Sequence, residues 1–239
     1  MKKIISISVL CISAALLVSC GNSGKKAEKA AKEQAMADSV AAAAQTQKTM
    51  DKIAQLPEEP VFDIVTTDGI IKVKLYSKTP KHRENFAKLA FEGFYDNVLF
   101  HRVIKGFMIQ AGDPLTKDEA NADRFGTGGP DYTIEAEFVP EYRHKKGAIA
   151  AARRGDAVNP FKESSGSQFY LVQDPDACAQ LDGEYTVFGE TVEGMDIIDK
   201  IAAVQTGPRD RPVRNIKIIT IKLDKEMNSG TPLASSKDE

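Results

Sequence analysis

The stretch that decides the fold is Phe100–Pro114, which reads FHRVIKGFMIQAGDP. Its first apolar run contains one arginine, Arg102, and its second apolar run ends in Gln110. A strand that only fills a core has no need of a cation, because arginine is mostly exposed unless it is paired. An apolar floor that carries one cation and one amide suits the binding of a neutral, partly apolar group that accepts hydrogen bonds.

Four further blocks follow along the chain: GTGG at 126–129, GAIAAA at 147–152, SGSQFYL at 165–171 and LDGEYTVFG at 181–189. Each block alone is weak, because glycine-rich turns and apolar strands are common. Together, in this order and at roughly this spacing, they resemble the cyclophilins, a family of peptidyl-prolyl cis–trans isomerases. The resemblance runs from about Val61 to Leu223, with insertions.

The segments at 61–67 and 70–76 flank Asp68-Gly69, which is a strong hairpin signal. Many short strands with two helical stretches predict a mainly β domain, either a closed barrel or a sandwich. The resemblance selects the cyclophilin-like fold, a closed eight-stranded antiparallel β-barrel capped by two α-helices. We expect those helices after Thr79-Pro80 and near Met195–Ile201.

Finer expectations concern the ends of these elements. Thr79 is the expected N-cap of the first helix, with Pro80 at its first position. In the first hairpin, apolar residues at 71, 73 and 75 alternate with lysines, so that one face is buried. The last strand is expected at Asn215–Leu223, with Ile219 and Ile221 on its buried face.

The resemblance also implies site residues. Arg102 matches the catalytic arginine of the family. Judged from the pattern alone it could be a surface arginine on an edge strand, and the apolar site residues could be plain core. The implied walls of a proline-binding pocket are Phe107, Met108, Phe169 and Leu181, and the residues that orient the substrate backbone are Gln110 and Gln168.

Three positions depart from the family. Ala152 and Arg153 fall on the substrate-edge strand, where the family usually has Ala-Asn, so contacts from Arg153 are expected mainly through its backbone. Tyr185 stands where many cyclophilins have histidine, and it offers a hydroxyl for substrate binding in place of an imidazole. Gln180 stands where cyclophilins that bind cyclosporin tightly usually have tryptophan.

The remaining reactive residue types suggest no further chemistry. His101 matches a structural histidine of the family, whereas His82 and His144 are expected to face solvent. Because the histidines are scattered and the GTGG turn lacks a phosphate-loop lysine, we expect no metal site and no cofactor. Cys178 is expected to be a buried, unpaired thiol.

The N-terminus has lysines at positions 2 and 3, an apolar run at 4–18 and then Ser19-Cys20-Gly21. This is typical of an export signal and is short for a membrane-spanning helix. The residues Leu17-Val18-Ser19-Cys20 are similar to the bacterial lipobox, so we expect a lipoprotein signal peptide at 1–19 and lipidation of Cys20. The alternative is an ordinary secretory signal with an incidental cysteine.

Residues 20–59 are rich in Ala, Lys and Glu, and they predict a tether that is either coil or helix, or otherwise a partner-binding helix. The expected isomerase domain spans 60–225, and a disordered tail is expected at 226–239. Two charged insertions, Leu115–Phe125 and Arg154–Ser164, are expected to set which chains the site accepts.

These features predict a peptidyl-prolyl cis–trans isomerase that assists folding of exported proteins in the bacterial cell envelope. Its expected partners are proline-containing unfolded or partly folded polypeptides, and it is expected to be a monomer held by lipid to the outer membrane, facing the periplasm. The formal charge is −2, and mild acidity argues against a nucleic-acid partner. A docking module of the same fold and a passive structural lipoprotein are the alternatives.

Overall fold

The computed structural model describes residues 23–229. The predicted signal peptide, Cys20 and residues 230–239 lie outside the described residues. The chain divides into two compact units, residues 1–47 and 48–239, which we describe separately. The helices and 3₁₀-helices of the described residues are α1 (Ser23–Ala54), α2 (Pro80–Phe91), α3 (Pro175–Cys178), α4 (Met195–Ala202), α5 (Lys225–Asn228), η1 (Pro114–Lys117), η2 (Glu119–Arg124), η3 (Ala179–Leu181) and η4 (Pro208–Asp210).

The first unit is helical in its described part. Helix α1 contains 32 residues, in keeping with the many alanines of this segment. Met36 and Val40 are 71% and 62% exposed, so they lie on an open helix surface. The last turns of α1, from Lys48 onward, belong to the second unit, where Ile53 packs against the core. Across residues 23–229, no helix combines the length and the hydropathy that a bilayer span requires.

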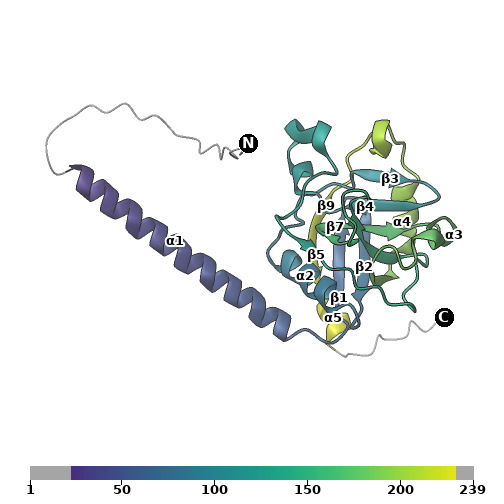
Figure 1. The fold of residues 1–239 in the computed structure, drawn as a ribbon, viewed down its shortest axis with the longest axis horizontal. Helices are drawn as coiled ribbons and strands as arrows, with labels where there is room; N and C mark the ends of the chain where they lie inside the picture. Colours follow the sequence, from purple (N-terminus) through teal and green to yellow (C-terminus); the bar gives the residue numbers. More distant parts are fainter. Residues whose placement is uncertain (1–22, 230–239) are drawn as a thin grey trace, which may run out of the picture. The chain divides into compact units, whose positions relative to one another are not determined.

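The second unit is a mainly β domain, shown in Figure 1. Its described strands are β1 (Val61–Thr66), β2 (Gly69–Leu75), β3 (Arg102–Ile104), β4 (Met108–Ala111), β5 (Thr133–Ile134), β6 (Ala148–Arg153), β7 (Ser164–Val172), β8 (Val187–Glu193) and β9 (Ile218–Leu223). Eight of them lie in the order β3-β4-β7-β6-β8-β2-β1-β9, and β5 pairs with β7 off this path. Every pair is antiparallel.

The prediction that the barrel is closed is wrong, because the end strands β3 and β9 do not pair with each other. Only an isolated bridge and three backbone hydrogen bonds of 2.8–2.9 Å join residues 97–100 to residues 216–218. Asn97 has φ 66°, and this left-handed residue bends the segment before β3 out of strand geometry. The result is an open, curled half-barrel.

The first hairpin forms as predicted. Strands β1 and β2 pair in register from Val61–Lys74 to Thr66–Gly69, and Ile71, Val73 and Leu75 are fully buried. The predicted burial in the last strand is wrong at Ile219, which is 48% exposed, while Ile218 and Ile221 are buried. The β1–β9 register shifts here, so the strand bulges and turns one residue outward.

The two predicted helices are present as α2 and α4, and they flank the curled sheet (Figure 1). Thr79 occupies the N-cap position of α2, but its side chain does not cap the helix. Instead, the Glu137 carboxylate accepts hydrogen bonds of 3.0 Å from the backbone amides of Lys81 and His82. A carboxylate from a distant segment thus satisfies the free amides of the first turn.

The main core fills the inside of the curled sheet. Its largest fully buried side chains are aromatic, and they meet edge-on or tilted, with ring centroids 5.3–5.8 Å apart for Phe62–Phe86, Phe86–Tyr95 and Tyr95–Phe169. Such pairs add to the stability that burial of their area provides.

The start of the predicted disordered tail is structured. Helix α5 spans Lys225–Asn228, and the Asn228 side chain donates to the backbone oxygen of Val61 over 2.8 Å and accepts from its amide over 3.0 Å. This side chain pairs with the backbone of Val61, the first residue of β1, just where the domain begins.

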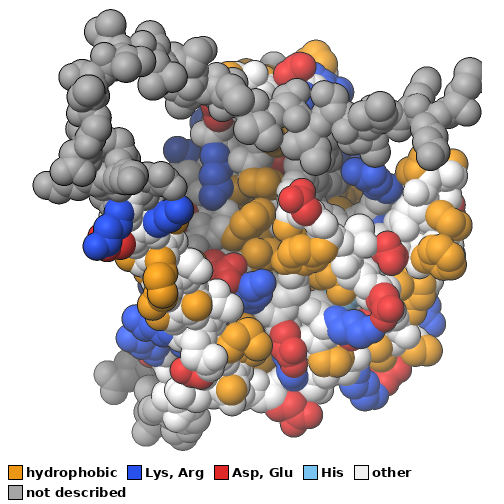
Figure 2. Space-filling view, turned by 60° about the vertical axis from the view of Figure 1, so that its left-hand side comes forward, with side chains coloured by type: hydrophobic (Ala, Val, Ile, Leu, Met, Phe, Trp, Pro, Cys, Tyr) orange, Lys and Arg blue, Asp and Glu red, His pale blue; other side chains and the backbone are white. Residues whose placement is uncertain are grey.

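The molecular surface carries mixed charge. Figure 2 shows Lys and Arg side chains interspersed with Asp and Glu side chains on one face, among the residues that are described. This face offers no broad field of one sign, which agrees with the small formal charge of −2.

Candidate active site

A row of directly opposed residues crosses four adjacent strands. Arg102 of β3 lies opposite Gln110 of β4, Gln110 lies opposite Tyr170 of β7, and Tyr170 lies opposite Ala150 of β6. Directly opposed residues project from the same face of a sheet. The outer face therefore carries a guanidinium, an amide and a phenol side by side, and the phenol is buried, since Tyr170 is 4% exposed. Arg102 lies on an end strand with its side chain 44% exposed, so it is open to a ligand.

Phe169 lies on the other face. It belongs to the main core and packs against Phe86 and Tyr95, with ring centroids 5.6 and 5.7 Å away. The prediction that Phe169 lines the substrate site is wrong, because successive strand residues point to opposite faces. Tyr170, the next residue, takes the place on the outer face.

An apolar cluster flanks the row on the outer face, and we name it the outer apolar cluster. Its buried members are Tyr76, Met108, Ala148, Ala150, Tyr170, Val172, Cys178 and Val187, and its half-buried members are Ile104, Phe107, Tyr142, Ala152, Leu181 and Tyr185. The structure thus brings together five predicted site residues from three segments that are far apart in sequence. They are Phe107, Met108, Ala152, Leu181 and Tyr185.

The two predicted glutamines form a chain of hydrogen bonds. The Gln110 side chain donates to the Gln168 side-chain oxygen over 3.0 Å, and the Gln168 amide donates to the Gly126 and Gly128 carbonyls over 3.1 and 2.8 Å. Gln168 is only 7% exposed. It therefore ties the GTGG turn to Gln110, and Gln110 is the glutamine that faces outward beside Arg102.

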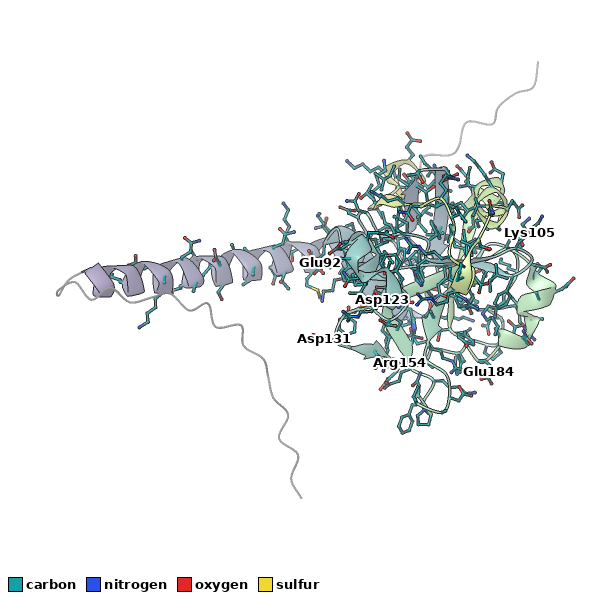
Figure 3. All side chains as sticks on the ribbon, turned by 90° about the horizontal axis from the view of Figure 1, so that it is seen from above. Glu92, Lys105, Asp123, Asp131, Arg154 and Glu184 are labelled. Carbon is teal, nitrogen blue, oxygen red and sulfur yellow. The ribbon has the colours of Figure 1, made fainter. Side chains whose placement is uncertain are left out.

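Arg153 is largely buried, with 4% of its side chain exposed. Its Nε donates to the Glu184 backbone oxygen over 2.8 Å, and its guanidinium lies 4.4 Å from the Tyr185 ring centroid. The side chain is therefore committed to holding this turn, and only its backbone remains for an extended peptide. Figure 3 labels the neighbouring Arg154 and Glu184, which lie at one edge of the domain.

The second insertion projects beyond Arg154. Within it, Asn159 closes the loop by donating to the Glu163 backbone oxygen over 2.8 Å. Its apolar residues point outward, since Val158 and Phe161 are 73% and 83% exposed. The loop thus presents apolar side chains next to the strand that the resemblance assigns to the substrate edge.

His144 is fully buried, which makes the prediction that it faces solvent wrong. Its Nδ1 lies 2.8 Å from Asp182 Oδ1, and its Nε2 lies 2.8 Å from the Tyr170 hydroxyl. Burial lowers the pKa of His144, so the ring is neutral near pH 7. A neutral ring that donates to Asp182 accepts from Tyr170, which fixes the tyrosine on the outer face.

Burial and hydrogen bonding shift the pKa of Asp182 in opposite directions. Desolvation raises its pKa, but hydrogen bonds from the His144 amide and ring and from Arg143 together outweigh it and hold the pKa below its usual value. Asp182 therefore stays ionised and keeps the His144 ring oriented. Asp182 directly follows Leu181, so the same turn supports the outer apolar cluster and the relay, by which we mean the hydrogen-bonded series Asp182, His144 and Tyr170.

The other two histidines are buried as well. His82 is 2% exposed with its Nδ1 2.6 Å from Glu137, so the prediction that it faces solvent is also wrong. His101 is 6% exposed, and burial lowers its pKa to about 4. Cys178 is a buried free thiol, as predicted, and burial raises its pKa to about 12. Residues 23–229 contain no cluster of three or more side chains that could hold a metal ion.

Comparisons with known proteins agree on the family. The profile described as cyclophilin type peptidyl-prolyl cis-trans isomerase/CLD matches residues 61–223. Human peptidyl-prolyl cis-trans isomerase-like 1 is 36% identical over 163 residues, which cover 68% of this chain and 91% of that protein. The chain belongs to the cyclophilin-type peptidyl-prolyl cis–trans isomerases.

Further similarities are to a longer protein that contains a cyclophilin domain and to solved structures. Peptidyl-prolyl cis-trans isomerase CYP71 of Arabidopsis thaliana is 40% identical over 71% of this chain, but the match covers only 25% of that protein. The crystal structure of a cyclophilin type isomerase of Cryptosporidium parvum has a TM-score of 0.61 at 29% identity and covers 70% of this chain and 98% of that one. A second structure of that protein, with a TM-score of 0.60, was obtained in the presence of the dipeptide Ala-Pro.

This cyclophilin is thus a peptidyl-prolyl cis–trans isomerase, and its substrates are proline-containing peptides. Sequence reasoning missed Tyr170, although the alternation Gln168, Tyr170 along one strand was a readable signal. It also missed Asp210, whose carboxylate lies 3.4 Å from Arg102 Nε. No local pattern announces that contact, because the two residues are 108 positions apart.

Proposed function

We propose that this chain is a lipid-anchored peptidyl-prolyl isomerase that assists the folding of exported proteins in a bacterial envelope, with Arg102 as its catalytic residue. The observation that carries the catalytic assignment is the row Arg102, Gln110 and Tyr170 beside the outer apolar cluster. The row combines a fixed cation, a peptide-binding amide and an apolar surface within one sheet face.

The chemistry requires no nucleophile. The barrier to rotation about a peptide bond is about 18–20 kcal/mol and arises from amide resonance. In the twisted transition state the prolyl nitrogen regains its lone pair. The guanidinium of Arg102 can donate a hydrogen bond to that nitrogen or to the adjacent carbonyl, and it then favours the twisted amide over the planar one.

The required acceleration is modest. Uncatalysed exchange takes about 10–100 s. A turnover of roughly 10³ per second therefore requires about 5–7 kcal/mol off the barrier. One preorganised hydrogen-bond donor contributes about 2.7–4 kcal/mol, and positioning with exclusion of water supplies the remainder.

The outer apolar cluster supplies the surface for the proline ring. Phe107, Leu181 and Tyr185 are half-buried, so each has surface left to cover with a ligand. Covering the ring methylenes stabilises the complex by about 0.8 kcal/mol per buried CH₂. Gln110, held by Gln168, is placed to bind the peptide backbone next to the ring.

The envelope role is supported by the N-terminal sequence. Lipidation at Cys20 would attach acyl chains whose burial contributes about 0.8 kcal/mol per CH₂, enough for lasting attachment when several chains are present. Helix α1, with 32 residues, would reach about 48 Å at 1.5 Å per residue. Gly21–Gly24 contain no acidic pair, which favours an outer-membrane anchor facing the periplasm. We propose that the anchored protein is a monomer.

Three measurements test the proposal. Cys20→Ser should move the protein from the membrane fraction to the soluble fraction or leave an uncleaved precursor, and mass spectrometry should find acyl chains on Cys20 of the parent. An unmodified Cys20 in the mature protein rejects the anchor. Refolding of an exported protein that is limited by a proline step should accelerate with the parent chain and not with Arg102→Ala.

A further inference from the structure

Residues 207–211 form a tight hairpin that directly precedes β9 in the fold. The Gly207 amide donates to the Arg211 carbonyl over 2.7 Å, and Thr206 bridges to Pro212. At its tip, Arg209 and Asp210 have φ 61° and 58°. Two consecutive left-handed residues that are not glycine are strained, and such strain persists only where surrounding contacts impose it.

The strained tip delivers a carboxylate to the catalytic side chain. Asp210 Oδ2 lies 3.4 Å from Arg102 Nε, and both side chains are about half exposed. A carboxylate on Nε leaves the two terminal nitrogens of the guanidinium for a substrate. The contact therefore restrains the rotation of Arg102 without occupying its outer donors.

Contacts with the first insertion hold the hairpin. Arg209 donates to the Asp123 backbone oxygen over 2.7 Å, and Arg211 donates to both Glu119 carboxylate oxygens over 2.8 and 3.0 Å. The Arg211 guanidinium also lies 4.6 Å from the Phe125 ring centroid.

A cavity of about 360 Å³ lies beneath the hairpin and is lined in part by His101, Phe125, Pro208 and Val213. The hairpin thus makes few contacts with the core on the side that faces this cavity. Its conformation depends on the contacts of Arg209 and Arg211 with the first insertion.

The insertion is itself anchored to the other side of the site. Asp113 is fully buried, and its carboxylate accepts from the amides of Leu115, Gly126 and Gly128. The carbonyls of Gly126 and Gly128 accept from Gln168, which holds Gln110 opposite Arg102. A continuous series of contacts therefore leads from Arg102 through the hairpin, the first insertion and the two glutamines back to Arg102.

We propose that Asp210 is a positioning residue for the Arg102 guanidinium, and that the first insertion serves to impose the strained hairpin that carries it. This inference rests on the proposed catalytic role of Arg102. It gives the insertion, Leu115–Phe125, a function in orienting the catalytic side chain in addition to any contact with substrate.

The test uses the full chain and separates strain from charge. Asp210→Gly removes the carboxylate and relieves the left-handed strain, so we expect a Tm equal to or above that of the parent but a kcat about tenfold lower, with KM changed by less than about twofold. Asp210→Asn keeps an acceptor oxygen and should recover part of the lost kcat. Asn97→Gly is the matched control, because Asn97 is also left-handed (φ 66°) but is exposed and outside the site. It should keep the parent kcat.

The double variant Arg102→Ala, Asp210→Gly identifies the route. If Asp210 acts through Arg102, the second change adds no further loss to the first. Parent-like kcat in Asp210→Gly, together with a large loss in Arg102→Ala, overturns the positioning role alone. Parent-like activity in Arg102→Ala overturns the catalytic assignment and the positioning role with it.

Discussion

Replacement of Arg102 by alanine is predicted to separate catalysis from stability. The side chain is 44% exposed, and it forms an ion pair with Asp210, which is 47% exposed. Exposed pairs of this kind contribute about 0–1 kcal/mol to the free energy of unfolding. In a domain of this size, 1 kcal/mol corresponds to a change in Tm of about 2–4 °C. The predicted fall in Tm is therefore no more than about 4 °C.

The loss of activity should be much larger. Removal of one preorganised donor from a site costs about 10²–10³ in kcat. The measurement is the cis-to-trans exchange of a proline-containing peptide, followed for the parent chain and for Arg102→Ala, with thermal unfolding of both. Arg102→Lys keeps the charge but not the planar fork of donors, and it should recover only part of the activity.

Arg214→Ala is the matched control for charge removal. Arg214 binds Asp68 with two hydrogen bonds of 2.7 and 3.0 Å, and Asp68 lies in the turn between β1 and β2, outside the site. Its loss leaves a largely buried carboxylate without this partner, so stability should fall while activity stays at the parent level. If Arg102→Ala keeps more than about a tenth of the parent kcat/KM, the loss is short of that expected and Arg102 is not the catalytic residue.

Three further predictions concern stability and inhibition. Burial lowers the pKa of His101 to about 4, so between about pH 6.5 and pH 4 the unfolded chain binds a proton on this ring that the folded chain does not bind. The free energy of unfolding should therefore fall by on the order of 3 kcal/mol over this range, seen as a lower midpoint of urea unfolding. The fall should be smaller in His101→Gln. Tyr170→Phe leaves Nε2 of His144 buried without its 2.8 Å partner, which should cost about 1–3 kcal/mol in urea unfolding and raise KM; parent-like values would show that the relay does not hold the tyrosine. Gln180 is exposed, so Gln180→Trp should fold normally and bind cyclosporin at least about tenfold more tightly, and nanomolar inhibition of the parent would contradict this.

Local pattern carried a large part of the fold. The β1–β2 hairpin, helices α2 and α4, the buried Cys178 and the mainly β class were all predicted, because each depends on residues close in sequence or on a period of two along a strand. Errors arose where two distant segments meet. The bulge at Ile219 depends on the register with β1, and the cap on α2 comes from Glu137.

The site divides in the same way. Residue types indicated that Arg102 and Gln110 serve binding, because a cation and an amide in an apolar strand have no evident structural purpose, and the resemblance to the cyclophilins added the apolar residues around Phe107 to the predicted site. Which side chains share a face was decided by strand pairing, which turns Tyr170 outward and Phe169 into the core. The burial of His144 was likewise decided by its packing between Asp182 and Tyr170.

The contact between Asp210 and Arg102 marks the limit of sequence reasoning. It joins residues 108 positions apart through a strained hairpin, and the hairpin keeps its shape through contacts with a third segment. Sequence determines the chemistry that each residue can perform and the local periodicity that places it on a face. Only the tertiary structure decides which charges meet, because that depends on the packing of segments whose separation along the chain carries no local signal.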